Sequence, residues 1–274
     1  MGALFGLLAS LSITSMEFFS RKITNEVGPI VAAAAGSLIA AVITVGIALV
    51  GGGDLIGRDL LLGAGSGLGF GLGLSTYLHG LRISSSAVIG PTVASLSALI
   101  PFGYAAISDD APPVLGYLGA ALAVVGLILV TVGGSAASNV AGGLPVGIIS
   151  GLGYGIGTLL LINVTEESGS WPIASQRTAA FAAIAIFALI RRRPVLPPIR
   201  FAGHAGAAGV IAAMASLFLL AGLTINPAAT SVTAAVYPAT SVAAGRTFFG
   251  DAVTRVQVLG LVVVILGTIA IVLA

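Results

Sequence analysis

Long apolar segments separated by short polar breaks run along the whole chain. A stretch of roughly 20 apolar residues is long enough to cross the hydrocarbon core of a bilayer as a helix. The pattern predicts ten such helices, at about residues 2–20, 28–50, 59–80, 84–106, 114–133, 143–163, 172–190, 202–223, 228–248 and 254–273. We therefore expect an all-α, polytopic membrane protein with ten transmembrane helices.

The sequence also repeats itself. Three landmarks recur at a constant offset of 141 residues, because 251−110, 260−119 and 267−126 give the same value: Asp110 with Asp251, Gly119 with Gly260, and Gly126 with Gly267. The pattern predicts two related five-helix repeats, residues 1–137 and 143–274. Because five is odd, the second repeat would enter the membrane from the opposite side, which makes the repeats inverted and favours a substrate site between them.

Composition agrees with this reading and excludes several classes of protein. Hydrophobic residues make up 57% of the chain and charged residues only 7%, far from a soluble domain. The absence of cysteine excludes disulfides and thiolate chemistry, and two histidines are too few for a histidine metal centre. We expect a multi-pass protein of the plasma membrane, with residues 1–20 as its first span rather than a cleaved signal peptide.

The charges are placed unevenly. The connections after odd-numbered helices carry most of the cations: Arg21, Lys22, Arg82, Arg191, Arg192, Arg193, Arg200 and Arg255, with Arg246 one turn away. The connections after even-numbered helices carry Arg58 among several acids. By the positive-inside rule the odd-numbered connections are cytoplasmic, which would place both termini outside.

Glycine rows indicate close helix packing. The segment at 59–80 carries two rows at four-residue spacing, Gly63, Gly67, Gly71 and Gly65, Gly69, Gly73. Small residues at this spacing let helix backbones approach closely in lipid. The two rows lie on nearly opposite faces, so we expect this helix to be packed between two neighbours. Space for a substrate is the alternative role for these glycines.

Several segments together resemble the EamA-type drug/metabolite transporter superfamily. These are Thr14–Lys22 in the first helix, Leu78–Ala87 between the third and fourth, Phe249–Asp251 before the last, Leu118-Gly119 and Leu259-Gly260 at the fifth and tenth, and Gln176-Arg177 near the start of the seventh. The first repeat departs from the family pattern, with Ala34 where the arginine is expected. The resemblance implies ten helices, small-solute transport and cytoplasmic termini, so it leaves the orientation open against the charge pattern.

Glu17 is the most informative carboxyl group, because acids inside a span tend to face a cavity or a partner. Spacings of four and three residues place Ser10, Thr14 and Glu17 on one helical face. This polar stripe predicts a carboxylate that contacts substrate or carries a coupled proton. The alternative is a local pair between Glu17 and Arg21, four residues later on the same helix.

Arg177 is the corresponding cation, about two turns inside the seventh helix. A guanidinium binds carboxylate or phosphate through two parallel hydrogen bonds, so Arg177 is a candidate substrate anchor. The alternatives are a side chain that reaches the lipid headgroups, or a pair with Glu166 or Glu167. With a zwitterionic substrate, Glu17 would face the ammonium group and Arg177 the carboxylate.

The remaining candidate substrate-binding residues are polar side chains near proline or glycine breaks: Tyr154, Tyr237, Thr240 and Thr92. Prolines in spans free backbone carbonyls that a cavity or neighbour must satisfy. We expect a polar cavity between the repeats, lined by the first, third, fourth, sixth, eighth and ninth helices, with both tyrosines on its wall. The fifth and tenth helices should be peripheral because they carry almost no polar side chains.

These features favour a secondary transporter or exporter of small metabolites, amino acids or drugs, working by alternating access at the repeat interface. The alternative is a membrane structural or assembly protein that transports nothing. Enzyme motifs are absent, and Asp109-Asp110 lacks the second acidic cluster of a diphosphate–metal site. We expect no cofactor, metal or nucleic acid, and a monomer or dimer whose partners are lipid, a small solute and, where transport is coupled, protons.

Overall fold

The protein is all-helical in the part of the chain that the structure, a computed structural model, describes, which is residues 1–107, 113–134, 139–225, 230, 233–234 and 236–274. Its α-helices are α1 (Gly2–Glu26), α2 (Pro29–Gly51), α3 (Gly57–Ile83), α4 (Ser86–Ile107), α5 (Val114–Val132), α6 (Val140–Leu161), α7 (Trp171–Ile190), α8 (Ala202–Ile225), α10 (Tyr237–Phe249) and α11 (Arg255–Val272). Two short 3₁₀ helices, η2 (Glu166–Ser168) and η3 (Ile199–Phe201), lie in the connections before α7 and α8.

Eight helices of the described chain are long and apolar enough to cross a membrane: α1, α2, α4, α5, α6, α7, the segment of η3 and α8, and α11. The glycine-rich α3 and α10, which has 13 described residues, are not among these eight. Large apolar side chains such as Leu68, Leu118, Ile186 and Leu266 are more than half exposed on the outer surface. Such a surface is unsuited to water, so the chain is a multi-pass membrane protein.

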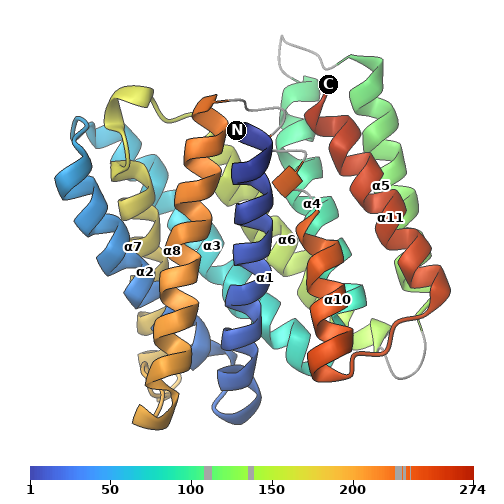
Figure 1. Ribbon diagram of the computed structural model, residues 1–274, viewed down its shortest axis with the longest axis horizontal. Helices are drawn as coiled ribbons and strands as arrows, with labels where there is room; N and C mark the ends of the chain where they lie inside the picture. The colour runs from blue at the N-terminus through green and yellow to red at the C-terminus, as the bar shows by residue number, and fades with distance from the viewer. Residues whose placement is uncertain (108–112, 135–138, 226–229, 231–232, 235) are drawn as a thin grey trace.

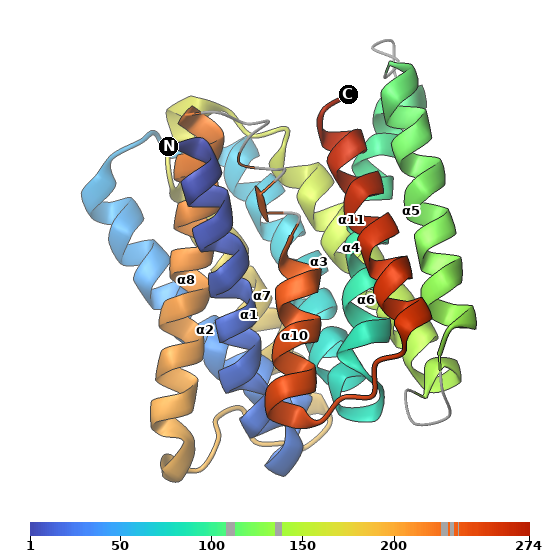
Figure 2. The same cartoon turned by 45° about the vertical axis from the view of Figure 1, so that its right-hand side comes forward.

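The helices form a bundle whose two sides are joined by a central group (Figures 1 and 2). The pair α5 and α11 lies at one side, α2, α7 and α8 lie at the other, and α1, α3, α6 and α10 lie between them. Within the bundle, α3 packs against α6 and α7, α1 against α8, α4 against α6, and α2 against α7 and α8. The termini lie at the same end of the bundle (Figure 1).

The two glycine rows of α3 face different neighbours, as the sequence predicts. A Cβ atom added at Gly67 would lie 2.2 Å from the Gln176 carbonyl oxygen of α7. A Cβ atom added at Gly69, on the other row, would lie 2.6 Å from the Gly153 carbonyl oxygen of α6. No side chain fits at either position, so glycine brings three helix backbones into direct contact. The packing role of these rows is confirmed.

The pair α5 and α11 meets through glycines that recur in the repeat. An added Cβ atom at Gly119 would lie 2.7 Å from the Gly267 carbonyl oxygen, and one at Gly126 would lie 2.8 Å from the Gly260 carbonyl oxygen. The reverse contacts have the same distances. Higher numbers on α5 meet lower numbers on α11, so the two helices are antiparallel. Both helices are peripheral in the bundle, as expected from their apolar sequences (Figure 1).

Replacing Gly126 by alanine is expected to separate α5 from α11. The new Cβ atom would lie 2.6 Å from the Val264 backbone nitrogen, which cannot rotate away. Overpacking of this kind costs about 1–3 kcal/mol. Thermal unfolding of the purified protein should show a lower midpoint than for the control Gly46→Ala, since a Cβ atom at Gly46 meets nothing within 4 Å. Equal midpoints for the two variants would contradict the close approach.

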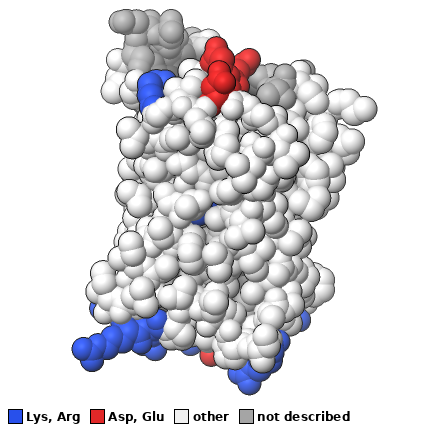
Figure 3. All heavy atoms as spheres, turned by 90° about the vertical axis from the view of Figure 1, so that its left-hand side faces the viewer, with Lys and Arg blue, Asp and Glu red and all other residues white. Residues whose placement is uncertain are grey.

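Charged side chains gather at the two ends of the bundle: most of the Lys and Arg in this view lie at one end, and the larger patch of Asp and Glu lies at the other (Figure 3). The α1–α2, α3–α4, α7–α8 and α10–α11 connections lie at the end opposite the termini (Figures 1 and 2). These connections and the helix ends beside them hold the arginines and lysine that the sequence predicts for one side of the membrane. The structure therefore has one end that is mainly basic, where Glu26 and Asp251 are paired with arginines, and one end that is mainly acidic.

Candidate functional site

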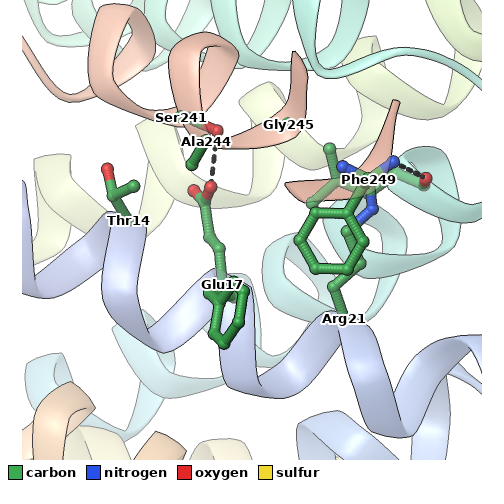
Figure 4. Close-up of a pocket in the computed structure, with 9 residues that line it drawn as sticks. Thr14, Glu17, Arg21, Ser241, Ala244, Gly245 and Phe249 are labelled. Carbon is green, nitrogen blue, oxygen red and sulfur yellow. Dashed lines mark hydrogen bonds between the residues drawn. The ribbon is translucent and has the colours of Figure 1, made fainter. Parts of the chain in front are cut away.

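Glu17 is buried among three helices. Its side chain is only 6% exposed. The Tyr77 hydroxyl of α3 donates a hydrogen bond to Oε1 over 2.6 Å, and the Ser241 hydroxyl of α10 donates to Oε2 over 2.5 Å. Figure 4 shows the carboxylate pointing across from α1 to Ser241. A buried carboxyl group held by neutral hydroxyls can exist with or without its proton, because hydroxyls rotate to suit either state.

A second polar contact joins the same two helices one turn away. The Thr14 and Thr240 hydroxyl oxygens are 2.6 Å apart, and Thr240 also donates to the Tyr237 carbonyl oxygen over 2.9 Å. Since the Thr240 proton is used there, Thr14 must be the donor between the two threonines. The structure thus brings together three predicted site residues, Thr14, Glu17 and Thr240.

Arg21 does not form the local pair with Glu17 that the sequence left as an alternative. Its guanidinium instead binds Asp251, in the connection between α10 and α11, with nitrogen–oxygen distances of 2.5 and 2.9 Å. Nη2 also donates to the Leu81 carbonyl oxygen over 3.0 Å, and the group lies over the Phe249 ring at 4.4 Å. Arg21 binds the distant Asp251 rather than Glu17 because both oxygens of Asp251 accept hydrogen bonds from the planar guanidinium.

Asp251 connects this ion pair to α4 as well. Its Oδ2 accepts a hydrogen bond from the Ser86 backbone nitrogen, the first residue of α4, over 2.9 Å. Burial opposes ionisation of Asp251, but the hydrogen bonds from Arg21 and Ser86 outweigh it and hold the pKa of the carboxyl group below its ordinary value. Arg21 and Asp251, which we name the basic-end latch, therefore tie α1, α3, α4 and the α10–α11 connection together.

A small cavity lies between Glu17 and the basic-end latch. Its volume is about 10 Å³, and it is lined by Thr14, Glu17, Phe18, Arg21, Leu81, Ser241, Ala244, Gly245 and Phe249 (Figure 4). A cavity of this volume holds about one water molecule. Helices α1, α3 and α10 line it, which are three of the six helices expected to line a polar cavity, and Tyr154 and Tyr237 are not among its lining residues.

Arg177 lies on α7 and contacts α8. Its Nη2 donates a hydrogen bond to the Ser216 hydroxyl of α8, and its Nε is buried without a hydrogen-bond partner. The predicted alternative, a pair with Glu166 or Glu167, is not formed. The ion pairs among the described residues all involve other arginines. Arg177 is thus a cation inside the bundle with a hydroxyl partner.

The two predicted tyrosines lie on α6 and at the start of α10. Tyr154 interacts electrostatically with Arg177 and Glu17, and Tyr237 interacts with Glu17 and Tyr154. Thr92 lies apart from this group: it donates to the Val88 carbonyl oxygen of its own helix and packs against α6. Thr14, Glu17 and Thr240 therefore belong, with Tyr77 and Ser241, to one hydrogen-bonded polar region of the bundle, and Thr92 does not.

Sequence reasoning missed two partners of the predicted residues, Tyr77 for Glu17 and Ser216 for Arg177. Each lies in a glycine- or alanine-rich helix with other polar residues, and helical spacing does not show which helix its face meets. The remaining acidic candidates give no metal site. Among the described residues no group of three or more His, Cys, Asp or Glu could hold a metal ion. Asp109 and Asp110 lie outside the described residues.

Comparisons with known proteins place the fold but no activity. No family model and no curated protein matches the chain. One crystal structure, whose description names no function, is similar with a TM-score of 0.67 at 16% identity, covering 99% of this chain and 97% of that one. Since coverage is nearly complete on both sides, the arrangement of the whole bundle occurs in a solved protein. At this identity the similarity shows the fold alone.

Proposed function

We propose that the protein is a secondary transporter of small solutes, of the EamA type, that works by alternating access. The observation that carries the proposal is the buried Glu17, held between α1, α3 and α10 by the Tyr77 and Ser241 hydroxyls. A carboxyl group in this position is costly to bury in a membrane protein and is typical of a substrate or ion pathway.

The architecture supports the proposal, because the packing suits two inverted repeats. Gly119 is the counterpart of Gly260, and Gly126 is the counterpart of Gly267, at the offset of 141 residues. In the structure Gly119 meets Gly267 and Gly126 meets Gly260, so each half offers the same surface to the other. Reciprocal contacts between antiparallel helices are what a two-fold axis perpendicular to the helices would produce, and in a bilayer such an axis would lie in the membrane plane.

Other helix contacts fit the same relation between the halves, in which α1, α2 and α3 correspond to α6, α7 and α8. The contact of α3 with α6 then corresponds to that of α8 with α1. The contact of α3 with α7 corresponds to that of α8 with α2. The polar region lies among the central helices, between the two sides of the bundle. Repeats that rock against one another would expose this region to one side of the membrane at a time.

Uptake into proteoliposomes tests the proposal directly. The purified protein is reconstituted and offered labelled amino acids, organic acids and lipophilic cations, with and without a proton gradient. Protein-dependent accumulation of at least one solute, above that of liposomes carrying a heat-inactivated sample, is the expected result. No transport of any solute under either condition would favour the alternative of a structural or assembly protein.

We expect the basic end of the bundle to face the cytoplasm. The connection between α7 and α8 carries Arg191, Arg192 and Arg193, and cations are retained on the cytoplasmic side. The chain has no cysteine, so a single cysteine introduced at Pro197 is a clean probe. It should react with a membrane-impermeant thiol reagent only after the cells are opened. Labelling in intact cells would reverse the orientation and agree with cytoplasmic termini.

A further inference from the structure

Arg177 has hydrogen-bonding capacity that the protein itself leaves unused. A guanidinium carries five N–H donors and keeps its charge at any physiological pH. In the structure Nη2 donates to Ser216, while Nε is buried and has no acceptor. No carboxylate of the described residues lies within ion-pair distance of it. A charge inside the bundle with one neutral partner is poorly compensated, so a bound anion would stabilise it.

The neighbours of Arg177 can assist the binding of an anion, but none of them supplies a negative charge. The Ser216 hydroxyl donates to the Ala212 carbonyl oxygen over 3.3 Å, so towards Arg177 it acts as an acceptor. Tyr154 of α6 interacts electrostatically with Arg177, and its hydroxyl forms no hydrogen bond with the described part of the chain. A tyrosine hydroxyl donates well to an oxyanion.

The Tyr154 ring is held in place by α3. The Phe70 ring meets it edge-on with 5.0 Å between ring centroids. On the same helix, an added Cβ atom at Gly73 would lie 3.0 Å from the Tyr154 ring. The Tyr154 side chain is therefore held in one position, which lowers the entropy lost when a ligand binds.

We propose that Arg177 and Tyr154 form a binding subsite for the oxyanion group, a carboxylate or a phosphate, of the transported solute. The subsite rests on the proposed transport function and adds the chemical class of the solute to it. Tyr154 also interacts with Glu17, so the subsite lies within the electrostatic influence of a carboxylate. A second anionic group on the solute would be repelled there, which favours solutes with one oxyanion group.

Ligand binding to the purified full-length protein tests the subsite without requiring transport. The probes are a series of monocarboxylic acids, including α-amino acids, with the matching amides and the matching phosphate monoesters. Binding is measured as the concentration dependence of the shift in thermal unfolding midpoint. We expect at least one carboxylate or phosphate ester to bind, and its neutral amide or alcohol to bind roughly tenfold to hundredfold more weakly, the range for a lost charged hydrogen bond.

Three variants test whether the preference for the anionic probe depends on Arg177. Arg177→Gln should abolish preference for the anionic probe, and Arg200→Gln, which removes an exposed arginine paired with Glu26, should keep it. Should Arg177→Gln fail to fold, Arg177→Lys replaces it. Lysine is a point charge without the bidentate fork, so this variant should weaken carboxylate binding about tenfold and phosphate binding less.

The outcomes separate the subsite from transport. Equal binding of anionic and neutral probes, or unchanged preference in Arg177→Gln, would overturn the subsite even where solutes cross the membrane. Binding that depends on Arg177, combined with no flux in proteoliposomes, would support the subsite and overturn the transport proposal. No binding of any probe to the unmodified protein would overturn the subsite.

Discussion

Glu17→Gln is expected to abolish accumulation driven by a pH gradient while downhill exchange of the same solute continues. Glutamine keeps the size of the side chain and can still hydrogen-bond to Tyr77 and Ser241, but it cannot release a proton. Among the described residues within the candidate spans, Glu17 is the buried carboxyl group that meets hydroxyls from two other helices. Accumulation should fall to the level of protein-free liposomes.

The matched control is Glu26→Gln at the end of the same helix. The Glu26 side chain is 58% exposed and pairs with Arg200, so its loss removes a carboxylate without touching the polar region. Accumulation and exchange should both be unchanged in this variant. Full retention of pH-driven accumulation in Glu17→Gln would remove Glu17 from proton coupling and leave it a structural contact between α1, α3 and α10.

Asp251→Asn is expected to open the basic end of the bundle. Removing one charge of a buried ion pair leaves the other uncompensated and costs about 3–5 kcal/mol. Arg21 is 7% exposed and would lose its carboxylate, while Leu81 would remain its backbone acceptor. States in which this end is open should therefore gain population by about 100-fold or more at that cost.

Accessibility of a cysteine in the small cavity measures this change. A cysteine placed at Ala244, which lines the cavity beside Glu17, should react slowly in the parent protein and much faster with Asp251→Asn. Arg200→Gln breaks an exposed ion pair and is the control that should leave the rate unchanged. Unaltered reactivity in the Asp251 variant would show that the basic-end latch does not close the cavity.

The same latch has a defined pH dependence. Because the pKa of Asp251 is held below its ordinary value in the folded protein, the ion pair stabilises the closed arrangement at any pH above that ordinary value. The stabilisation is lost as the pH falls through the lowered pKa. Relative to an exposed cysteine at position 197 measured at the same pH, which corrects for the loss of thiolate in acid, cysteine reactivity at position 244 should stay low at neutral pH and rise only in acid, whereas Asp251→Asn should show no such rise.

The sequence predicted the features that depend on periodicity. Spans follow from runs of apolar residues, and the packing of α3 between α6 and α7 follows from two glycine rows on opposite faces. The stripe of Thr14 and Glu17 likewise indicates one face of α1. These predictions need only the geometry of a single helix.

The partners of those faces could not be predicted. Arg21 has Glu17 four residues away, and local spacing favours that pair, but Asp251 lies 230 residues away and meets the guanidinium with two oxygens. Thr92 looked equivalent to Thr240 as a hydroxyl beside a proline, yet it faces α6 and donates to its own helix. Such choices depend on which helices meet, and one sequence does not contain that information.

The contacts of α1 with α10 and of α5 with α11 would respond differently to water. Thr14 with Thr240 and Glu17 with Ser241 are hydrogen bonds, and water can replace either partner at little net cost in free energy. The contact of α5 with α11 is made by glycine backbones that touch each other. Water that entered between these two helices would find no polar side chain there to hydrogen-bond. Hydration therefore favours separation of α1 from α10 over separation of α5 from α11, and in the proposed transport cycle α5 and α11 would be the pair that stays together.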